Sequence, residues 1–500
     1  MTHPTRIRRR SMLACGAAAL LAGCTVGPSF KPPAPPTVQA YPMQGDPTAN
    51  EAALGDRLAG DWWALFRSPQ IDQTVREAVA GNRTLEAARQ SLAEARDAIA
   101  AQAPAATLNA SGGVQQERTN IEAFGFSSSP VGRGGAVGLS NPTFTSYSFG
   151  LSGAYDFDVF GQRRREHERL VSLADAQADE ADAAYLTLTS EVVSEAIAVA
   201  ALKAEVAANE QIVASDQADL DMVTKAFEFG GGTRLDVVTE ETQLASDEAQ
   251  ITPLRAELGA ARHALALLVG KPPSGWSPPD FDLEQINQPA SLPVELPSEL
   301  VRDRPDIQAA EAQLHASMAQ IGVAKADLYP KVMLSASIAQ SSLSPGSFFS
   351  YGATGFNFGP TVSFPILGRP QLKAKVRMAE DEARGALADY QQVVLAAFVQ
   401  VANALQAVAF DDQLIKQTDR QLAAASENLT LQRQRYQAGK SPLLPVLDAQ
   451  RSYARASLAT VQSRAARLQD SAALLYAVSR NWDRAGTIEP QRTSLATVTG

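Results

Sequence analysis

The feature that most constrains this chain is a very long stretch with almost no helix-breaking residues, followed by a tight turn and a second helical stretch. The first stretch lies between Leu372 and Tyr436, within a hairpin that begins at about Arg369, and the second runs from Leu443 to Arg480. At about 1.5 Å per residue, the first predicts a helix roughly 100 Å long, far beyond the usual helix of a globular domain. Between them, Gly439 suits the left-handed end of the first helix, and Ser441 with Pro442 suits the start of the second. The pattern predicts a long antiparallel helical hairpin.

A second hairpin pattern lies 209 residues earlier in the chain. The turn at 227–230 aligns with the turn at 436–439, and Phe149 aligns with Phe358 at the same offset. A constant offset through a turn favours an internal duplication over chance convergence of two helix turns. We expect a first repeat over 61–290, with strands at 105–118 and 143–160 and a helical hairpin at 162–270. The second repeat is expected over 291–485, with a helix at 304–329, strands at 331–341 and 354–367 and a helical hairpin at 369–480. A tail over 486–500 follows.

The expected strands alternate between large apolar and small polar residues, as Phe149 and Leu151 do with Ser148 and Ser152. Strands of this kind suit a transmembrane barrel, with lipid on one side and water on the other, or a soluble two-layer β domain. Four strands cannot close a barrel, and an open sheet edge is not tolerated in lipid. A barrel would therefore need several chains, and three copies would give twelve strands, although the sequence does not set that number.

The expected long helices carry broad apolar stripes that are rich in alanine. Such stripes suit helices packed side by side in a helical barrel, and a soluble coiled-coil rod is the alternative. The rod would not need the strands.

The N-terminus has the pattern of an export signal over 1–23. Four arginines within the first ten residues precede a short apolar run, Ser11 to Ala22, which is too short to span a membrane as a mature helix. The run ends in Leu21-Ala22-Gly23-Cys24, which is similar to a bacterial lipobox. That similarity implies cleavage before Cys24 and lipid attachment to its sulfur, whereas the alternative is an ordinary signal peptide with an accidental cysteine. The proline-rich segment 24–60 is expected to be an extended tether.

The composition offers no sign of an enzyme. The formal net charge is −10, so nucleic-acid binding has no support. Cys15 would leave with the signal, and the mature chain would have no thiol, no disulfide and no cysteine metal site. No phosphate-binding glycine loop and no nucleophile elbow occurs in the sequence. We expect no catalytic residues, no metal and no cofactor other than the covalent lipid on Cys24.

Several motifs together resemble one family, the outer membrane efflux lipoproteins, which form the NodT-type branch of the TolC-like outer membrane factors. The motifs are Trp62-Trp63 with Phe66 and Pro69; Leu296 to Ile307 with Ala310-Glu311; Asn357-Phe358-Gly359-Pro360; and Val446 to Arg451. The resemblance covers essentially the whole mature chain. It implies an α + transmembrane β fold of the TolC-like type, with four strands and long antiparallel helices per protomer. As a homotrimer it would form a 12-stranded β-barrel in the outer membrane and an α-helical periplasmic tunnel.

The same resemblance implies a function and partners. The protein would be the outer-membrane channel of a tripartite efflux system, a passive exit duct for drugs or other small molecules. Its partners would be a periplasmic adaptor (membrane fusion) protein, an inner-membrane RND-type pump and outer-membrane lipid. The alternatives are an exit duct for type I protein secretion, or a structural periplasmic lipoprotein without a pore.

The resemblance also assigns residues at the hairpin tips. Leu444 and Asp448 match the pore gate, so that three copies would form a leucine ring and a carboxylate ring. Arg451, Tyr436 and Asp236 match latch positions. The turn residues Gly230, Gly231, Gly439 and Lys440 are candidate adaptor contacts. Pro445 and Ser441 depart from the pattern, because some relatives carry an acidic and a basic residue there, so the number of charged rings stays open.

Overall fold

The computed structural model describes residues 25–34, 40–43, 45–47, 52–54, 60–118, 143–289, 292–294 and 297–479. The expected signal peptide 1–23, Cys24 and the tail 486–500 lie outside these residues. The chain divides into two compact units, which are described separately. The strand unit comprises Met1–Lys31, Arg96–Ser172 and Leu314–Gly385, and the helical unit comprises Pro32–Ala95, Leu173–Gln313 and Ala386–Gly500.

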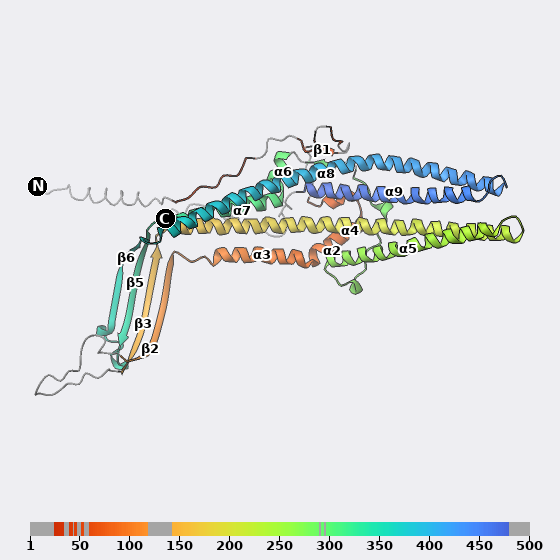
Figure 1. The fold of residues 1–500 in the computed structure, drawn as a ribbon. Helices are drawn as coiled ribbons and strands as arrows, with labels where there is room; N and C mark the ends of the chain where they lie inside the picture. The colour runs from red at the N-terminus through yellow and green to blue at the C-terminus, as the bar shows by residue number, and fades with distance from the viewer. Residues whose placement is uncertain are drawn as a thin grey trace, which may run out of the picture. The chain divides into compact units, whose positions relative to one another are not determined.

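The strand unit contains one four-stranded antiparallel sheet (Figure 1), with strands in the order β2-β3-β5-β6. The strands are β2 (Ala106–Arg118), β3 (Thr143–Asp156), β5 (Lys331–Ser342) and β6 (Thr354–Ser363). Both halves of the chain thus contribute one hairpin to a single sheet. Within the described residues, the outer edges of β2 and β6 pair with no further strand, so the sheet is open at both sides.

The strand register separates the two faces of this sheet. A polar row crosses all four strands through Asn109, Ser152, Ser337 and Asn357. The next row crosses them through Ala110, Leu151, Ile338 and Phe356. Because successive residues of a strand point to opposite faces, one face is apolar and the other is polar. Phe356 is 81% exposed in the single chain, so the apolar face lacks the cover that a soluble β domain would give it.

Each hairpin of strands leads into a long helix. α4 (Gln162–Glu228) follows β3 and α8 (Arg369–Gln437) follows β6. Next to the start of α4 lies the end of α7 (Pro305–Ala326), and the Gln162 amide donates to Asp327 at 2.9 Å just beyond it. This hydrogen bond therefore ties the start of α4 to the residue that follows the end of α7.

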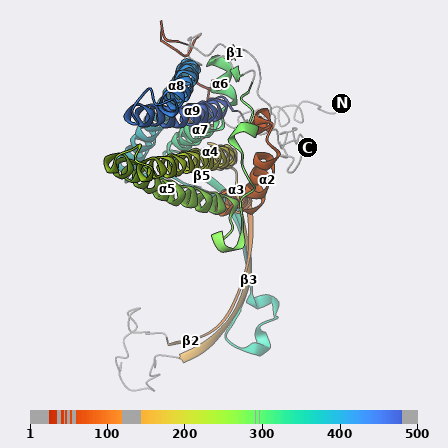
Figure 2. The same cartoon turned by 90° about the vertical axis from the view of Figure 1, so that its right-hand side faces the viewer.

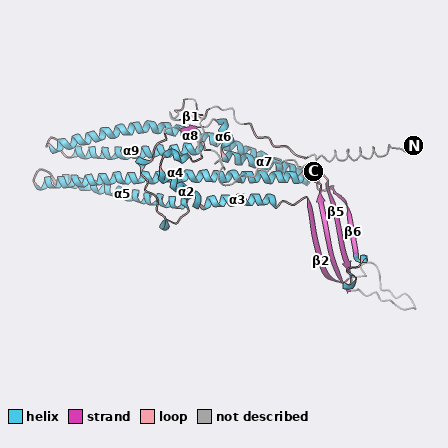
Figure 3. Ribbon diagram, turned by 180° about the vertical axis from the view of Figure 1, so that it is seen from behind, coloured by secondary structure: helices cyan, strands magenta, loops and turns pink. Residues whose placement is uncertain are grey.

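The helical unit is built from two helical hairpins. α4 returns as α5 (Arg234–Val269), and α8 returns as α9 (Leu444–Ala477). Figure 3 separates these helices from the strands by colour, and Figure 2 views the arms nearly end-on as one bundle. α4 and α8 are long and apolar enough, by length and composition, to cross a membrane. In this bundle, however, apolar residues of both arms, such as Ile197 and Val401, are fully buried.

Short elements surround the middle of the bundle. They are the turn of 3-10 helix Trp62–Phe66, α2 (Pro69–Gly81), α3 (Arg83–Ala100), the parallel strand pair β1 (Ala52–Leu54) and β4 (Leu292–Val294), and α6 (Pro297–Asp303). Asn82 caps α3, because its Oδ1 accepts from the Leu85 amide at 2.9 Å. Its Nδ2 donates to the Leu268 carbonyl near the end of α5, also at 2.9 Å. One side chain thereby caps α3 and ties it to the end of α5.

The turns of the two hairpins agree with the sequence prediction in one respect and correct it in another. Gly230 and Gly439 both have positive φ, 77° and 67°, as expected for left-handed helix ends. The prediction that Ser441 caps the returning helix with Pro442 in its first turn is wrong. α9 begins at Leu444, Leu443 takes the cap position without a side-chain hydrogen bond, and Pro445 lies in the first turn. Because proline lacks an N–H and has a helical φ, Pro445 suits that position without a capping side chain.

Candidate channel gate at the hairpin tips

The two residues predicted to line the gate lie on one exposed face of α9. Leu444 is 58% exposed, and the Asp448 side chain is 62% exposed one turn further on. The intervening residues Val446 and Leu447 are buried. The helix is therefore fixed on its inner side, and it presents a leucine and a carboxylate on the outer side.

Arg451 connects the predicted gate carboxylate to the opposite hairpin. Its Nη1 lies 3.3 Å from Asp448 Oδ1, so the structure brings this predicted pair together. Its Nε donates to Gln243 Oε1 on α5 at 2.8 Å. Gln243 in turn donates to Asp247 at 2.6 Å. Sequence reasoning missed Gln243, because no local pattern relates α5 to α9.

The other two latch residues occupy different environments. Tyr436 packs against the apolar tip cluster formed by Val223, Val237, Leu429, Leu443, Val446, Leu447 and Ala449. Burial raises the pKa of the Tyr436 hydroxyl, and the charge of nearby Asp236 raises this pKa further. Asp236 itself accepts from the Thr233 amide at 2.9 Å and its amide donates to Thr233 Oγ1 at 3.2 Å, which is a capping box at the start of α5. Among the described residues, no hydrogen bond joins Asp236 to Tyr436.

Behind the gate lies a partly buried polar seam, made by Ser215, Asp216, Asp219, Arg433 and Gln450. Arg433 Nη2 on α8 donates to Ser215 Oγ at 2.6 Å and to Asp219 Oδ2 at 2.8 Å, both on α4. It also donates to Gln450 Oε1 on α9 at 3.1 Å, and the Gln450 amide donates to Asp216. The seam therefore holds the second hairpin against α4 through hydrogen bonds, of which the Gln450–Asp216 bond is buried and those of Arg433 are partly buried. Polar residues on long helices are the only sign of this seam in the sequence.

Two carboxylates, Asp216 in the seam and Glu240 beside it, are buried without full hydrogen bonding. Glu240 on α5 is fully buried, and neither of its oxygens has a hydrogen-bond partner within the described part of the chain. Burial raises the pKa of Glu240 to about 7, and the charge of Asp219 adds to this. Burial also raises the pKa of Asp216, with a further contribution from nearby Asp247. Protons at these carboxylates would remove unfavourable buried charge.

The predicted adaptor-contact residues Gly230, Gly231, Gly439 and Lys440 are all exposed at the turns. A Cβ atom added at Gly230 or at Gly439 would meet no atom within 4 Å. Around the first turn, Phe229 is 88% exposed and Leu235 is 73% exposed, which the sequence analysis did not single out. The first tip thus combines open backbone with two exposed apolar side chains.

An open two-faced sheet in one unit and paired helical hairpins in the other define an outer-membrane channel with a helical extension. The family model described as outer membrane efflux protein matches residues 74–271 and 296–479. Nodulation protein T of Rhizobium leguminosarum bv. trifolii is 31% identical over 92% of this chain and 94% of its own length. Pyoverdine export outer membrane protein OpmQ of Pseudomonas aeruginosa is 30% identical over 85% of this chain and 88% of its own length. The solved outer-membrane channel OprN superposes with a TM-score of 0.79 at 26% identity, over 92% of this chain and 100% of that one.

The chain therefore belongs to the outer membrane efflux protein family. It has the TolC-like fold and is the outer-membrane channel component of a tripartite efflux system. The predicted family, fold and function are confirmed.

Proposed function

We propose that three copies of this chain close into one passive exit duct. The observation that carries this proposal is the open sheet: two unpaired edges, one apolar row and one polar row. In lipid an unpaired edge is too costly to persist, so β2 of one copy is expected to pair with β6 of the next. Three copies of the four-stranded sheet supply twelve strands, enough to surround a water-filled lumen lined by the polar row.

The exposed face of α9 supplies the gate in this proposal. Three Leu444 side chains would narrow and dry the pore, and three Asp448 carboxylates would favour cations. Arg451 would hold Asp448 and, through Gln243, keep both hairpins together in the closed state. Tyr436 would support this state by packing, and Asp236 would support it by starting α5 at a fixed residue.

The tips serve as the contact with a periplasmic adaptor protein, which links the duct to an inner-membrane RND-type pump. Gly230, Gly231, Gly439 and Lys440 leave the backbone accessible, and Phe229 with Leu235 adds apolar area. The cargo is a drug or other small molecule, and the chain holds Cys24 as its lipid attachment site in the outer membrane. Cargo choice would lie mostly in the pump, since the gate combines only leucine and carboxylate rings.

Single-channel conductance in a planar lipid bilayer tests this function. The wild-type protein is compared with a variant that combines Leu444→Ala and Asp448→Ala. We expect a small, cation-selective conductance that rises severalfold in the variant and loses cation preference. If neither protein conducts, the duct is contradicted and a periplasmic lipoprotein without a pore becomes the better interpretation. If both proteins conduct equally and with a large conductance, the gate does not lie at Leu444 and Asp448.

A further inference from the structure

The residues directly after Cys24 lie in a tight cleft beside the strands, although the sequence predicts that they begin an extended tether. The Val26 amide donates to the Phe160 carbonyl, between β3 and α4, at 3.2 Å. Thr25 packs on Gly161, where an added Cβ would lie 2.7 Å from Thr25 Cγ2. The segment therefore continues the folded base of α4 from the first described residue.

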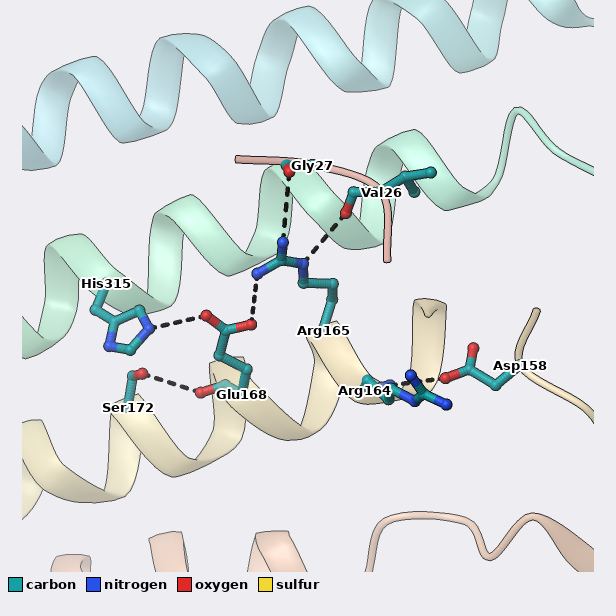
Figure 4. A network of polar contacts seen from close by, with 8 residues as sticks. All are labelled: Val26, Gly27, Asp158, Arg164, Arg165, Glu168, Ser172 and His315. Carbon is teal, nitrogen blue, oxygen red and sulfur yellow. Dashed lines mark hydrogen bonds and ion pairs between the residues drawn. The ribbon is translucent and has the colours of Figure 1, made fainter. Parts of the chain in front are cut away.

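Arg165 on α4 recognises the backbone of this segment (Figure 4). Its Nε donates to the Val26 carbonyl at 3.2 Å and its Nη2 donates to the Gly27 carbonyl at 3.4 Å. Its Nη1 lies 2.7 Å from Glu168 Oε2, and the Arg165 side chain is only 8% exposed. The Arg165 guanidinium is buried and has three partners, so its orientation is fixed. It binds the main-chain carbonyls of Val26 and Gly27, and these contacts do not depend on the side chains of the segment.

Two glycines make room for this arrangement. A Cβ added at Gly27 would lie 2.5 Å from the Gly322 Cα on α7, and Gly27 has a φ of +101°. A Cβ added at Gly322 would lie 2.7 Å from Arg165 Cγ. Side chains at either position would separate α7, Arg165 and the N-terminal segment, so the cleft requires glycine on both sides.

His315 and Glu168 complete the cleft. The ring of Phe30 stacks on His315, with centroids 4.2 Å apart and planes inclined by 12°. His315 Nε2 lies 2.9 Å from Glu168 Oε1 (Figure 4). Burial would raise the pKa of Glu168, but hydrogen bonds from His315 and Arg165 outweigh it and lower this pKa. Glu168 thus stays ionised and orients both the arginine and the histidine.

We propose that Arg165, Glu168, His315 and Gly322 form a docking site for the chain's own segment Thr25–Phe30, which fixes the lipid anchor beside the foot of the barrel. This inference rests on the proposed lipid at Cys24. Because Thr25 is already docked, a single peptide unit separates the docked chain from the lipidated residue, about 3.8 Å between Cα atoms. The acyl chains are thereby held where β3 ends, and each protomer is oriented on the membrane before its strands pair with the neighbouring copies.

Hydrogen exchange of the peptide covering 25–31 tests the dock in the full-length lipoprotein. Arg165→Ala changes the α4 side of the cleft, and Gly27→Ala changes the docked segment, where the added Cβ would meet the Gly322 backbone. The matched controls are Arg169→Ala, which removes a comparable Arg–Glu pair one turn along α4, and Gly45→Ala, at a positive φ with no atom within 4 Å. We expect about tenfold faster exchange in the first two variants and no change in the controls. Unprotected amides in the wild type, or equal exchange in all variants, would overturn the dock.

The amount of heat-stable trimer per lipidated chain in outer membranes tests the anchoring role. We expect it to fall severalfold in Arg165→Ala and Gly27→Ala, with lipid still present by mass, and to stay at the wild-type level in both controls. If the variants whose segment 25–31 exchanges faster still form as much trimer as the wild type, the anchoring role is contradicted. A Cys24→Ser chain exported by an ordinary signal should keep the protected segment but lose trimer. If this chain kept both the protected segment and the trimer, the lipid proposal would be contradicted, whereas the docking of 25–30 would still be supported. The conductance of the trimers tests the duct separately.

Discussion

Arg451 on α9 donates its Nε hydrogen to Gln243 Oε1 on α5 at 2.8 Å, while its Nη1 lies 3.3 Å from Asp448. One side chain thus joins an exposed carboxylate of one hairpin to the other hairpin. The Arg451–Asp448 pair is exposed to solvent, and such pairs contribute about 0.2–1 kcal/mol. That is too little to hold the fold, but it is enough to bias two positions of a tip.

Removing this link should open the tip without unfolding it. In Arg451→Ala, Asp448 loses its cation and Gln243 loses a donor, so we expect the population of conducting channels to rise about two- to fivefold. Single-channel open probability is the measurement, and Arg455→Ala, an exposed arginine one turn further along α9, is the control. Equal open probability in the two variants would show that Arg451 is no latch.

The partly buried seam should matter more for stability than the exposed latch. In Arg433→Ala, the buried carboxylate of Asp219 loses its partner, at a cost of about 2 kcal/mol given that Arg433 is itself partly exposed. Hydrogen exchange over 429–452 should accelerate more than tenfold. Arg435→Ala, exposed on the same helix, should leave exchange unchanged. Adding Asp219→Ala should restore part of the loss, and a simple sum of both losses would contradict the pairing.

The tip should be more stable in mild acid than in mild base. Glu240 binds its proton more tightly in the folded tip, where burial raises its pKa to about 7, than in an unfolded chain with a pKa near 4.5. This contribution is therefore fully present below about pH 4.5 and is lost as the pH rises through about 7. The charged groups that face Glu240 are Asp216 and Asp219 on α4, Asp247 on α5, Arg433 on α8 and Arg451 on α9.

A comparison of Glu240→Gln with the wild type isolates this effect. The variant keeps the shape of the side chain without the titration. The wild-type tip should therefore exchange amides much faster than the variant at pH 8 and at a similar rate near pH 4, below the pKa of an unfolded glutamate. Taking the ratio at each pH cancels the intrinsic pH dependence of exchange. Glu241→Gln, at the exposed neighbouring position, should match the wild type throughout. A pH-independent ratio for Glu240→Gln would mean that Glu240 does not titrate in this range.

The sequence predicts those parts of the molecule that depend on residues close together in the chain. The hairpins follow from unbroken helical stretches around Gly230 and Gly439, and the strands follow from a period of two. The pairing of Asp448 with Arg451 follows from their spacing of three residues on one helix. The choice of gate residues came from family resemblance rather than from spacing.

Contacts between distant segments could not be predicted in the same way. Gln243 meets Arg451 across 208 residues, and Asp216 meets Gln450 across 234. Each of these side chains looks like an ordinary polar residue on a long helix until the hairpins pack. The docking of the segment after Cys24 could not be predicted either. The proline-rich composition of 24–60 indicates an extended tether, and the glycines that make room for the segment lie far apart in the sequence.

Adjacent residues of β3 should respond in opposite ways to the same substitution. Leu151 lies in the apolar row and Ser152 in the polar row. If the apolar row faces lipid, Leu151→Arg places a charge in hydrocarbon at a cost of about 2–4 kcal/mol near the midplane, so the trimer recovered from outer membranes should fall strongly. Ser152→Arg would add a ring of positive charge to the lumen, so it should leave the amount of trimer unchanged and lower the cation preference of the conductance. Loss of trimer in Ser152→Arg with a tolerated Leu151→Arg would mean that the faces are reversed, and tolerance of both would mean that the sheet does not span the membrane.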